Sequence, residues 1–152
     1  MASACLVDAN VLVYSVDRRE HGKHECAAET LRLLQTEGMG GVSTQALAEF
    51  FSISTRRIPD PLTPTEAYER VVDLVDAFSV YGVTQAIVLE AARAARDHQM
   101  SYWDAQIWAT AKLNQIPYVL SEDLQGWDRL EGIRFVNPLV KGFDLASLGI
   151  SR

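Results

Sequence analysis

The chain has 152 residues, of which 48% are hydrophobic and 22% are charged. This composition suits one folded domain with a buried core and excludes a largely disordered chain. The formal net charge of −6 argues against broad electrostatic capture of nucleic acid. No stretch approaches the ~20 apolar residues that cross a bilayer, and a strand is expected within a few residues of the N-terminus, which leaves no room for a signal peptide. We therefore expect a soluble, cytoplasmic protein with a single domain over residues 1–152.

Apolar runs of strand length alternate with segments of helical periodicity along the chain. In chain order, strands are expected near residues 3–7, 42–43, 79–81, 118–120 and 134–136, and helices near residues 11–14, 24–37, 44–57, 64–78, 84–97 and 101–114. Short apolar strands that alternate with helices predict an α/β domain. We expect a three-layer α/β/α sandwich around a central parallel sheet of four to five strands.

The helix that starts after residue 63 carries the clearest local signals. Thr63, Pro64 and Glu66 form a capping box with proline at the first helical position. The buried face of this helix is predicted to consist of Tyr68, Val71, Val72 and Val75.

Two acidic residues directly follow apolar runs that resemble buried parallel strands. Asp8 follows residues 4–7, and Asp123 comes shortly after residues 118–120. Because the carboxyl ends of parallel strands meet at one sheet edge, we expect these carboxylates to converge. Carboxylates that are forced together repel each other unless they share a cation, which indicates a hard divalent metal. Alternatively, Asp8 caps the following helix, and Asp123 belongs to an exposed turn in which it or Glu122 points inward.

Two further acidic residues lie in expected helices. Glu49 is at the border of an apolar helical face, and the alternative is an ordinary solvated glutamate. Asp104 ends a Ser-x-x-Asp pattern that begins at Ser101, and such a pattern also caps helices without any chemistry. Trp103, beside Asp104, is expected to be a core aromatic, with stacking on a nucleobase as the alternative.

Taken together, these motifs resemble those of a PIN domain, and in particular the VapC-type toxins of toxin–antitoxin pairs. The resemblance covers nearly the whole chain and rests on the order of the segments LVDANVL (6–12), QxxxEF (45–50), YWDAQIWATA (102–111), LSEDLQG (120–126) and FVNP (135–138). Trp127 departs from the pattern, because a polar residue is expected after the last acidic motif.

The resemblance implies a metal-dependent endoribonuclease that uses Mg²⁺ or Mn²⁺, forms a homodimer and is inhibited by a cognate antitoxin. The implied catalytic residues are Asp8, Glu49, Asp104 and Asp123, of which Asp8, Asp104 and Asp123 hold the metal, with Asn10 and Ser121 as accessory polar residues. On this hypothesis water attacks the phosphate, so the products carry 5′-phosphate and 3′-hydroxyl ends.

Three other functions are compatible with parts of the sequence. The main one is a non-catalytic PIN-like module that binds RNA or protein. A phosphatase of the haloacid dehalogenase type also opens with an acid after a strand, but it needs a second aspartate where this chain has Asn10. Metal-free acid–base catalysis would use His21, His24 or His98, which we expect to be surface residues instead. The cluster of Arg18, Arg19 and Lys23 is either a guide for the RNA backbone or a solvated loop.

Overall fold

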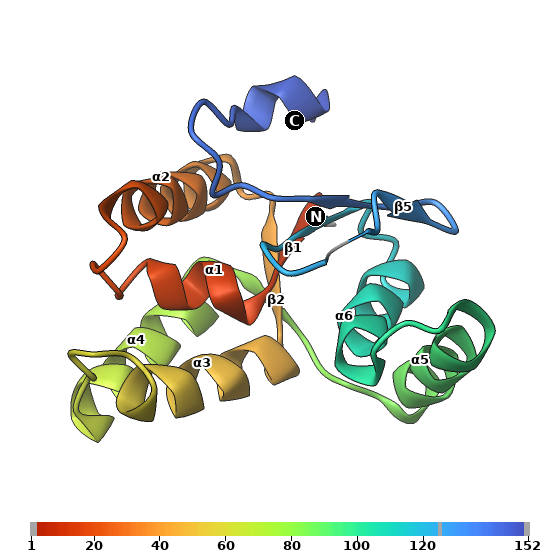
Figure 1. Ribbon diagram of the computed structural model, residues 1–152, viewed down its shortest axis with the longest axis horizontal. Coiled ribbons are helices and arrows are strands. Elements are labelled where there is room, and N and C mark those ends of the chain that lie inside the picture. The colour runs from red at the N-terminus through yellow and green to blue at the C-terminus, as the bar shows by residue number, and fades with distance from the viewer. Residues whose placement is uncertain (1–2, 125, 151–152) are drawn as a thin grey trace.

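One mixed sheet organises the computed structural model, which describes residues 3–124 and 126–150 (Figure 1). Gln125, part of the LSEDLQG motif, lies outside the described residues. The elements, in chain order, are β1 (Cys5–Val7), α1 (Ala9–Tyr14), α2 (His21–Glu37), β2 (Gly40–Ser43), α3 (Thr44–Arg56), α4 (Pro64–Ala77), β3 (Ser79–Tyr81), α5 (Gln85–His98), α6 (Tyr102–Leu113), β4 (Tyr118–Leu120), β5 (Arg129–Leu130), β6 (Ile133–Val136) and a 3-10 helix, η1 (Leu145–Leu148).

The strand order is β3-β2-β1-β4-β6-β5. The first five of these strands pair in parallel, whereas β5 pairs antiparallel with β6. The expected parallel sheet is therefore confirmed, with one extra two-residue strand at its edge. From β1 the chain first builds the sheet on one side, through β2 and β3, and later returns to the other side with β4. The boundary between β1 and β4 is thus the switch point of the sheet, where α/β proteins usually bind ligands.

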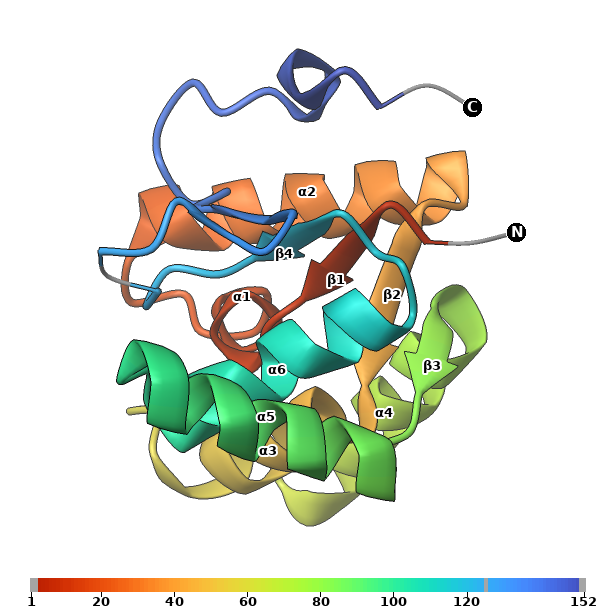
Figure 2. The same ribbon diagram turned by 90° about the vertical axis from the view of Figure 1, so that its right-hand side faces the viewer.

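Two apolar cores lie on opposite faces of the sheet. Cys5 and Val7 of β1 point into the core shared with α1, α2 and α3, and Leu6 points into the core shared with α5 and α6. Figure 2 shows the same arrangement, with α2 on one side of β1 and β4, and with α5 and α6 on the other. All three residues of β1 are buried, as expected of a central parallel strand. The predicted three-layer α/β/α sandwich is confirmed.

Helix α4 begins as predicted but turns a different face inward. The Thr63 hydroxyl accepts a hydrogen bond from the Glu66 backbone N–H (3.1 Å), and the Glu66 carboxylate accepts one from the Thr63 N–H (2.9 Å). The prediction of its buried face was wrong for Tyr68, Val72 and Val75, whose exposed fractions are 65%, 40% and 46%. The neighbouring stripe packs against the core instead, and it consists of Ala67, Val71 and Leu74.

The two stripes of α4 differ by one residue, or about 100° around the helix. Both are apolar and both recur at helical spacing, so periodicity alone does not distinguish them. None of the helices in the described part of the chain is long and apolar enough to cross a membrane.

Candidate active site

Strand register brings the ends of β1 and β4 together at the switch point. Val7 pairs with Leu120, and the Asp8 backbone N–H donates to the Leu120 carbonyl oxygen (2.9 Å). The next residues of the two strands, Asp8 and Ser121, therefore leave the sheet side by side.

Four of the expected site residues form one hydrogen-bonded cluster. The Ser121 hydroxyl donates to Asp8 Oδ2 (2.7 Å), and the Asn10 amide donates to Ser121 Oγ (3.0 Å) and Asp123 Oδ2 (3.3 Å). Asp8 Oδ1 accepts the Ala9 N–H (2.7 Å), so the helix-cap alternative is also correct. The two roles are compatible because they use different oxygens of one carboxylate.

The turn after β4 separates its two acidic residues. Glu122 forms an ion pair with Lys23 (2.7 Å), while its backbone N–H donates to Asn10 Oδ1 (3.2 Å). Asp123, in contrast, accepts the Asn10 amide. Of the two residues, Asp123 is therefore the one whose side chain joins the cluster.

Glu49 and Asp104 come within electrostatic reach of this cluster. Burial raises the pKa of Asp8 from 3.8 to about 6; hydrogen bonds from Ser121 and Ala9 oppose this rise, and the charges of Glu49 and Asp104 add to it. The pKa of Asp104 is also raised, mainly by burial and further by the charges of Asp123 and Glu49. These effects are typical of carboxylates that share a site without a cation.

None of the ion pairs in the described part of the chain involves these four carboxylates. Residues 3–124 and 126–150 also contain no group of three or more His, Cys, Asp and Glu side chains placed to hold a metal ion. The structure thus joins Asp8 and Asp123 through Asn10 and Ser121 and brings Glu49 and Asp104 near them, without a closed coordination shell.

A relay of side-chain hydrogen bonds holds Glu49 from the neighbouring helix. The Tyr102 hydroxyl donates to Gln106 Oε1 (2.8 Å), Gln106 Nε2 donates to Gln45 Oε1 (2.7 Å), and Gln45 Nε2 donates to Glu49 Oε1 (2.8 Å). A carboxylate only accepts, so its charge sets the direction of every bond in the relay. Sequence reasoning missed the roles of Gln45, Gln106 and Tyr102, although all three lie in the quoted motifs.

The first turn of α6 differs from the sequence expectation in two ways. Ser101 occupies the N-cap position but, among the described residues, its side chain makes no capping hydrogen bond. Trp103 is 62% exposed, so its prediction as a core aromatic was wrong. It precedes the buried part of the helix, which runs from Ala105 to Ala111.

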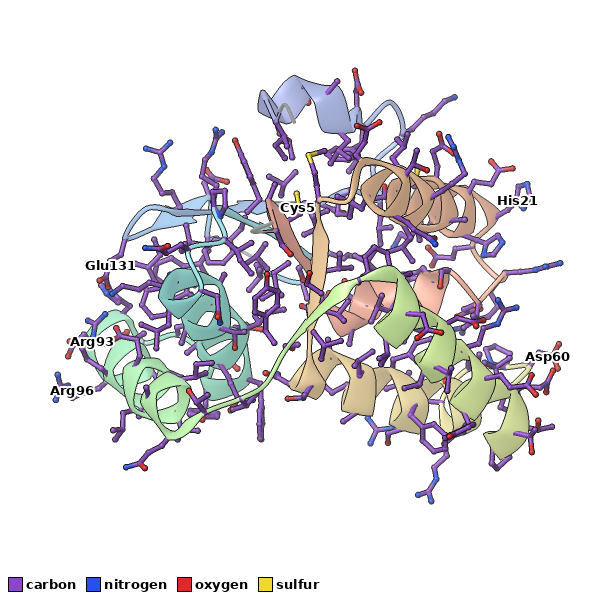
Figure 3. All side chains as sticks on the ribbon, turned by 180° about the vertical axis from the view of Figure 1, so that it is seen from behind. Cys5, His21, Asp60, Arg93, Arg96 and Glu131 are labelled. Atoms are coloured by element: carbon purple, nitrogen blue, oxygen red, sulfur yellow. The ribbon has the colours of Figure 1, made fainter. Side chains whose placement is uncertain are left out.

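The histidines are all engaged outside the carboxylate cluster. His21 pairs with Glu25, His24 Nδ1 contacts the Tyr14 carbonyl oxygen (2.8 Å), and His98 pairs with Glu131. In Figure 3, His21 and Glu131 lie at opposite ends of the molecule. This placement gives no support to metal-free acid–base catalysis by a pair of histidines.

Comparison with known proteins places this fold in a family. The model of the PIN domain family matches residues 5–133. The chain belongs to the PIN domain family. Its membership argues against the phosphatase alternative, and a search of curated proteins finds no match.

Solved structures agree with this assignment of the fold. The PIN domain resembles a chain of VapBC2 from Rickettsia felis bound to a DNA fragment from their promoter (TM-score 0.66, 12% identity, 88% of this chain and 97% of that one). It also resembles a chain of DNA-bound VapBC from Salmonella typhimurium (TM-score 0.65, 18% identity, 91% and 99%). A third similar structure is Mycobacterium tuberculosis VapC20, a toxin that cleaves the sarcin–ricin loop (TM-score 0.61, 18% identity, 76% and 86%).

Proposed function

We propose that this PIN domain is a metal-dependent endoribonuclease and the toxin of a VapBC-type pair, acting in the cytoplasm. The observation that carries the proposal is the group of four carboxylates at the sheet switch point, which have no cationic partner among the described residues. A non-catalytic binding module has no need for buried acids whose charges add to the rise that burial causes in the pKa of Asp8 and Asp104.

The donor set fits Mg²⁺ or Mn²⁺. Every candidate ligand atom is a carboxylate, amide or hydroxyl oxygen, which hard cations prefer, and Mg²⁺ retains several waters and so needs few protein ligands. We assign Asp8, Asp104 and Asp123 to hold the cation. When bound, it supplies a water of lowered pKa and neutralises charge on the phosphate.

The remaining groups position the reactants. Asn10 and Ser121 fix the carboxylates of Asp8 and Asp123. Gln45 holds Glu49 Oε1, and no hydrogen bond reaches Oε2 from the part of the chain that the structure describes, so we assign Glu49 to orient the attacking water. The water oxygen bonds to phosphorus, the bond to the 3′-oxygen breaks, and that oxygen leaves with a proton. Hydrolysis then yields a 5′-phosphate and a 3′-hydroxyl.

Cleavage of RNA by the purified protein tests this function. The wild type should cleave in Mg²⁺ or Mn²⁺ and lose activity in a chelator, and Asp8→Asn should be inactive. Asp60→Asn is a matched control, since Asp60 lies in the exposed loop before α4 (Figure 3). Equal cleavage by the wild type and Asp8→Asn would overturn the assignment, and products with 2′,3′-cyclic phosphate ends would reject attack by water.

We further propose a cognate antitoxin and a homodimer as partners. VapBC complexes among the structural neighbours support the antitoxin, and co-purification of a small protein from the adjacent gene tests it. The exposed stripe of Tyr68, Val72 and Val75 on α4 supports a protein interface. Sedimentation should show a dimer that Val72→Glu converts to a monomer, and an unchanged mass for this variant would place the dimer contact elsewhere.

A further inference from the structure

A groove between α3 and α6 extends from the carboxylate site. It has a volume of about 660 Å³, and its lining includes Gln45, Glu49, Arg57, Val83 and Trp103. This volume lies within the ~300–1,000 Å³ range of small-molecule sites. Because Glu49 is one of its walls, a ligand in this groove lies beside one of the proposed catalytic residues.

Trp103 presents an aromatic surface at one end of the groove. The indole is 62% exposed, although a tryptophan offers more apolar area for burial than most side chains. Its ring contact with Tyr102 is edge-to-face, with centroids 5.2 Å apart at an angle of 83°. A contact of this geometry covers at most one face of the indole, and the 62% exposure leaves much of its surface accessible to a planar ligand.

Arg57 supplies a positive charge at the other end of the groove. It takes part in none of the ion pairs between described residues, whereas Arg19 and Lys23 are neutralised by Asp17 and by Glu20 with Glu122. Arg57 also lines a second hollow, of about 190 Å³, together with Asn10 and Asp123. The charge of Arg57 is therefore available both in the groove, beside Glu49, and in the second hollow, beside Asp123.

The two ends are separated by the length of α3. Gln45, whose amide contacts the Trp103 carbonyl oxygen, and Arg57 are twelve residues apart, which corresponds to roughly 18 Å along a helix. This length spans several nucleotides at ~3.4 Å per stacked base. Glu49 lies between the two ends.

We propose that an unpaired stretch of RNA lies along α3, with one base stacked on Trp103 and a backbone phosphate bound by Arg57. This inference rests on the proposed ribonuclease function and deepens it to the residues that hold the strand, because an unpaired base exposes its face for stacking. A net charge of −6 gives little general attraction for RNA. Stacking, which does not depend on charge, is then needed for affinity.

A double-mutant cycle tests the stacking contact directly. The affinity of a single-stranded RNA 10-mer is compared with that of a fully abasic ribose-phosphate 10-mer, in an Asp8→Asn background that keeps the strands intact. Trp103→Ala should weaken binding of the RNA about tenfold and leave binding of the abasic strand unchanged, and Trp103→Phe should retain most of the affinity. Leu89→Ala is the matched control, since Leu89 is 64% exposed on α5 outside the groove.

The phosphate contact has a different signature. Arg57→Ala should weaken both strands equally, by about tenfold, and should lower the salt dependence of binding by about one counterion. Arg56→Ala is its matched control, because Arg56 is exposed on the same helix and does not line the groove. An equal effect of both arginine variants overturns the role of Arg57.

The outcomes separate this inference from the proposed function. If the wild type leaves RNA uncut with Mg²⁺ and Mn²⁺, the ribonuclease assignment fails, and a stacking signature would then describe a binding site alone. If the wild type cleaves RNA but Trp103→Ala changes the affinity for the RNA and for the abasic strand equally, or changes neither, only the proposed stacking site is wrong. Loss of antitoxin binding by Trp103→Ala with unchanged RNA affinity also overturns it, since Trp103 then contacts protein.

Discussion

In buffer that contains a chelator at about pH 7, Asp8→Asn should be more stable than the wild type. The cause is the position of Asp8 in the metal-free cluster, where burial and the charges of Glu49 and Asp104 raise its pKa from 3.8 to about 6. The folded protein therefore binds a proton on Asp8 more readily than the unfolded chain does. The contribution of Asp8 to stability is complete below about pH 4 and is lost as the pH rises through about 6.

The size of the effect follows from the shift in pKa. A rise of about two units, at ~1.4 kcal/mol per unit, makes ionised Asp8 cost about 3 kcal/mol at neutral pH. Asparagine removes this cost but weakens the hydrogen bond from Ser121, which offsets about 1 kcal/mol. The expected net gain is about 2 kcal/mol, or an increase in Tm of about 4–8 °C for a chain of this length.

Thermal unfolding followed by circular dichroism tests this reasoning. Asp8→Asn should be more stable than the wild type at about pH 7, and this advantage should be gone near pH 4. Added Mg²⁺ should raise the Tm of the wild type more than that of the variant, because the proposed cation binds the Asp8 carboxylate, which the variant lacks. A variant that is less stable than the wild type at neutral pH, or a difference that does not change with pH, would refute the account of the cluster.

Three further predictions concern the surroundings of the site. Gln106→Leu should lower single-turnover cleavage about tenfold at unchanged RNA affinity, because Glu49 loses the far half of its hydrogen-bond relay; a change in affinity alone would contradict this. Glu131→Gln should lower the free energy of unfolding by about 1 kcal/mol at neutral pH. Arg93, Lys112 and His98 lower the pKa of Glu131 to about 2. The stabilisation by ionised Glu131 therefore exists above about pH 4.5 and is lost as the pH falls towards 2. Solvent screens this network because the Glu131 side chain is 34% exposed, which keeps its contribution small. Unfolding by urea at two pH values measures the contribution. Gly40→Ala should lower the free energy of unfolding by about 1–3 kcal/mol in the same assay, since a Cβ atom there would lie 2.6 Å from the Phe78 ring. A variant as stable as the wild type would contradict this prediction and would mean that the ring moves aside freely.

Much of the candidate site was open to prediction because its residues follow strand ends. Asp8 and Ser121 come directly after β1 and β4, and a parallel register necessarily brings such positions together. Glu49 and Asp104 had no comparable local signal, and only the order of the motifs pointed to them. The relay through Gln106 was beyond prediction, since it joins residues 61 apart in the chain and depends on how α6 packs against α3.

The sequence by itself determined the five parallel strands, the approximate positions of the helices and the α/β class, because these follow from local periodicity and capping, as the box at Thr63 and Glu66 illustrates. Tertiary structure decided which side chains face inward. On α4 the stripe of Ala67 is buried and that of Tyr68 is exposed, and Trp103 is exposed in the groove beside Glu49. Burial depends on which surface each helix meets, and that surface comes from distant parts of the chain.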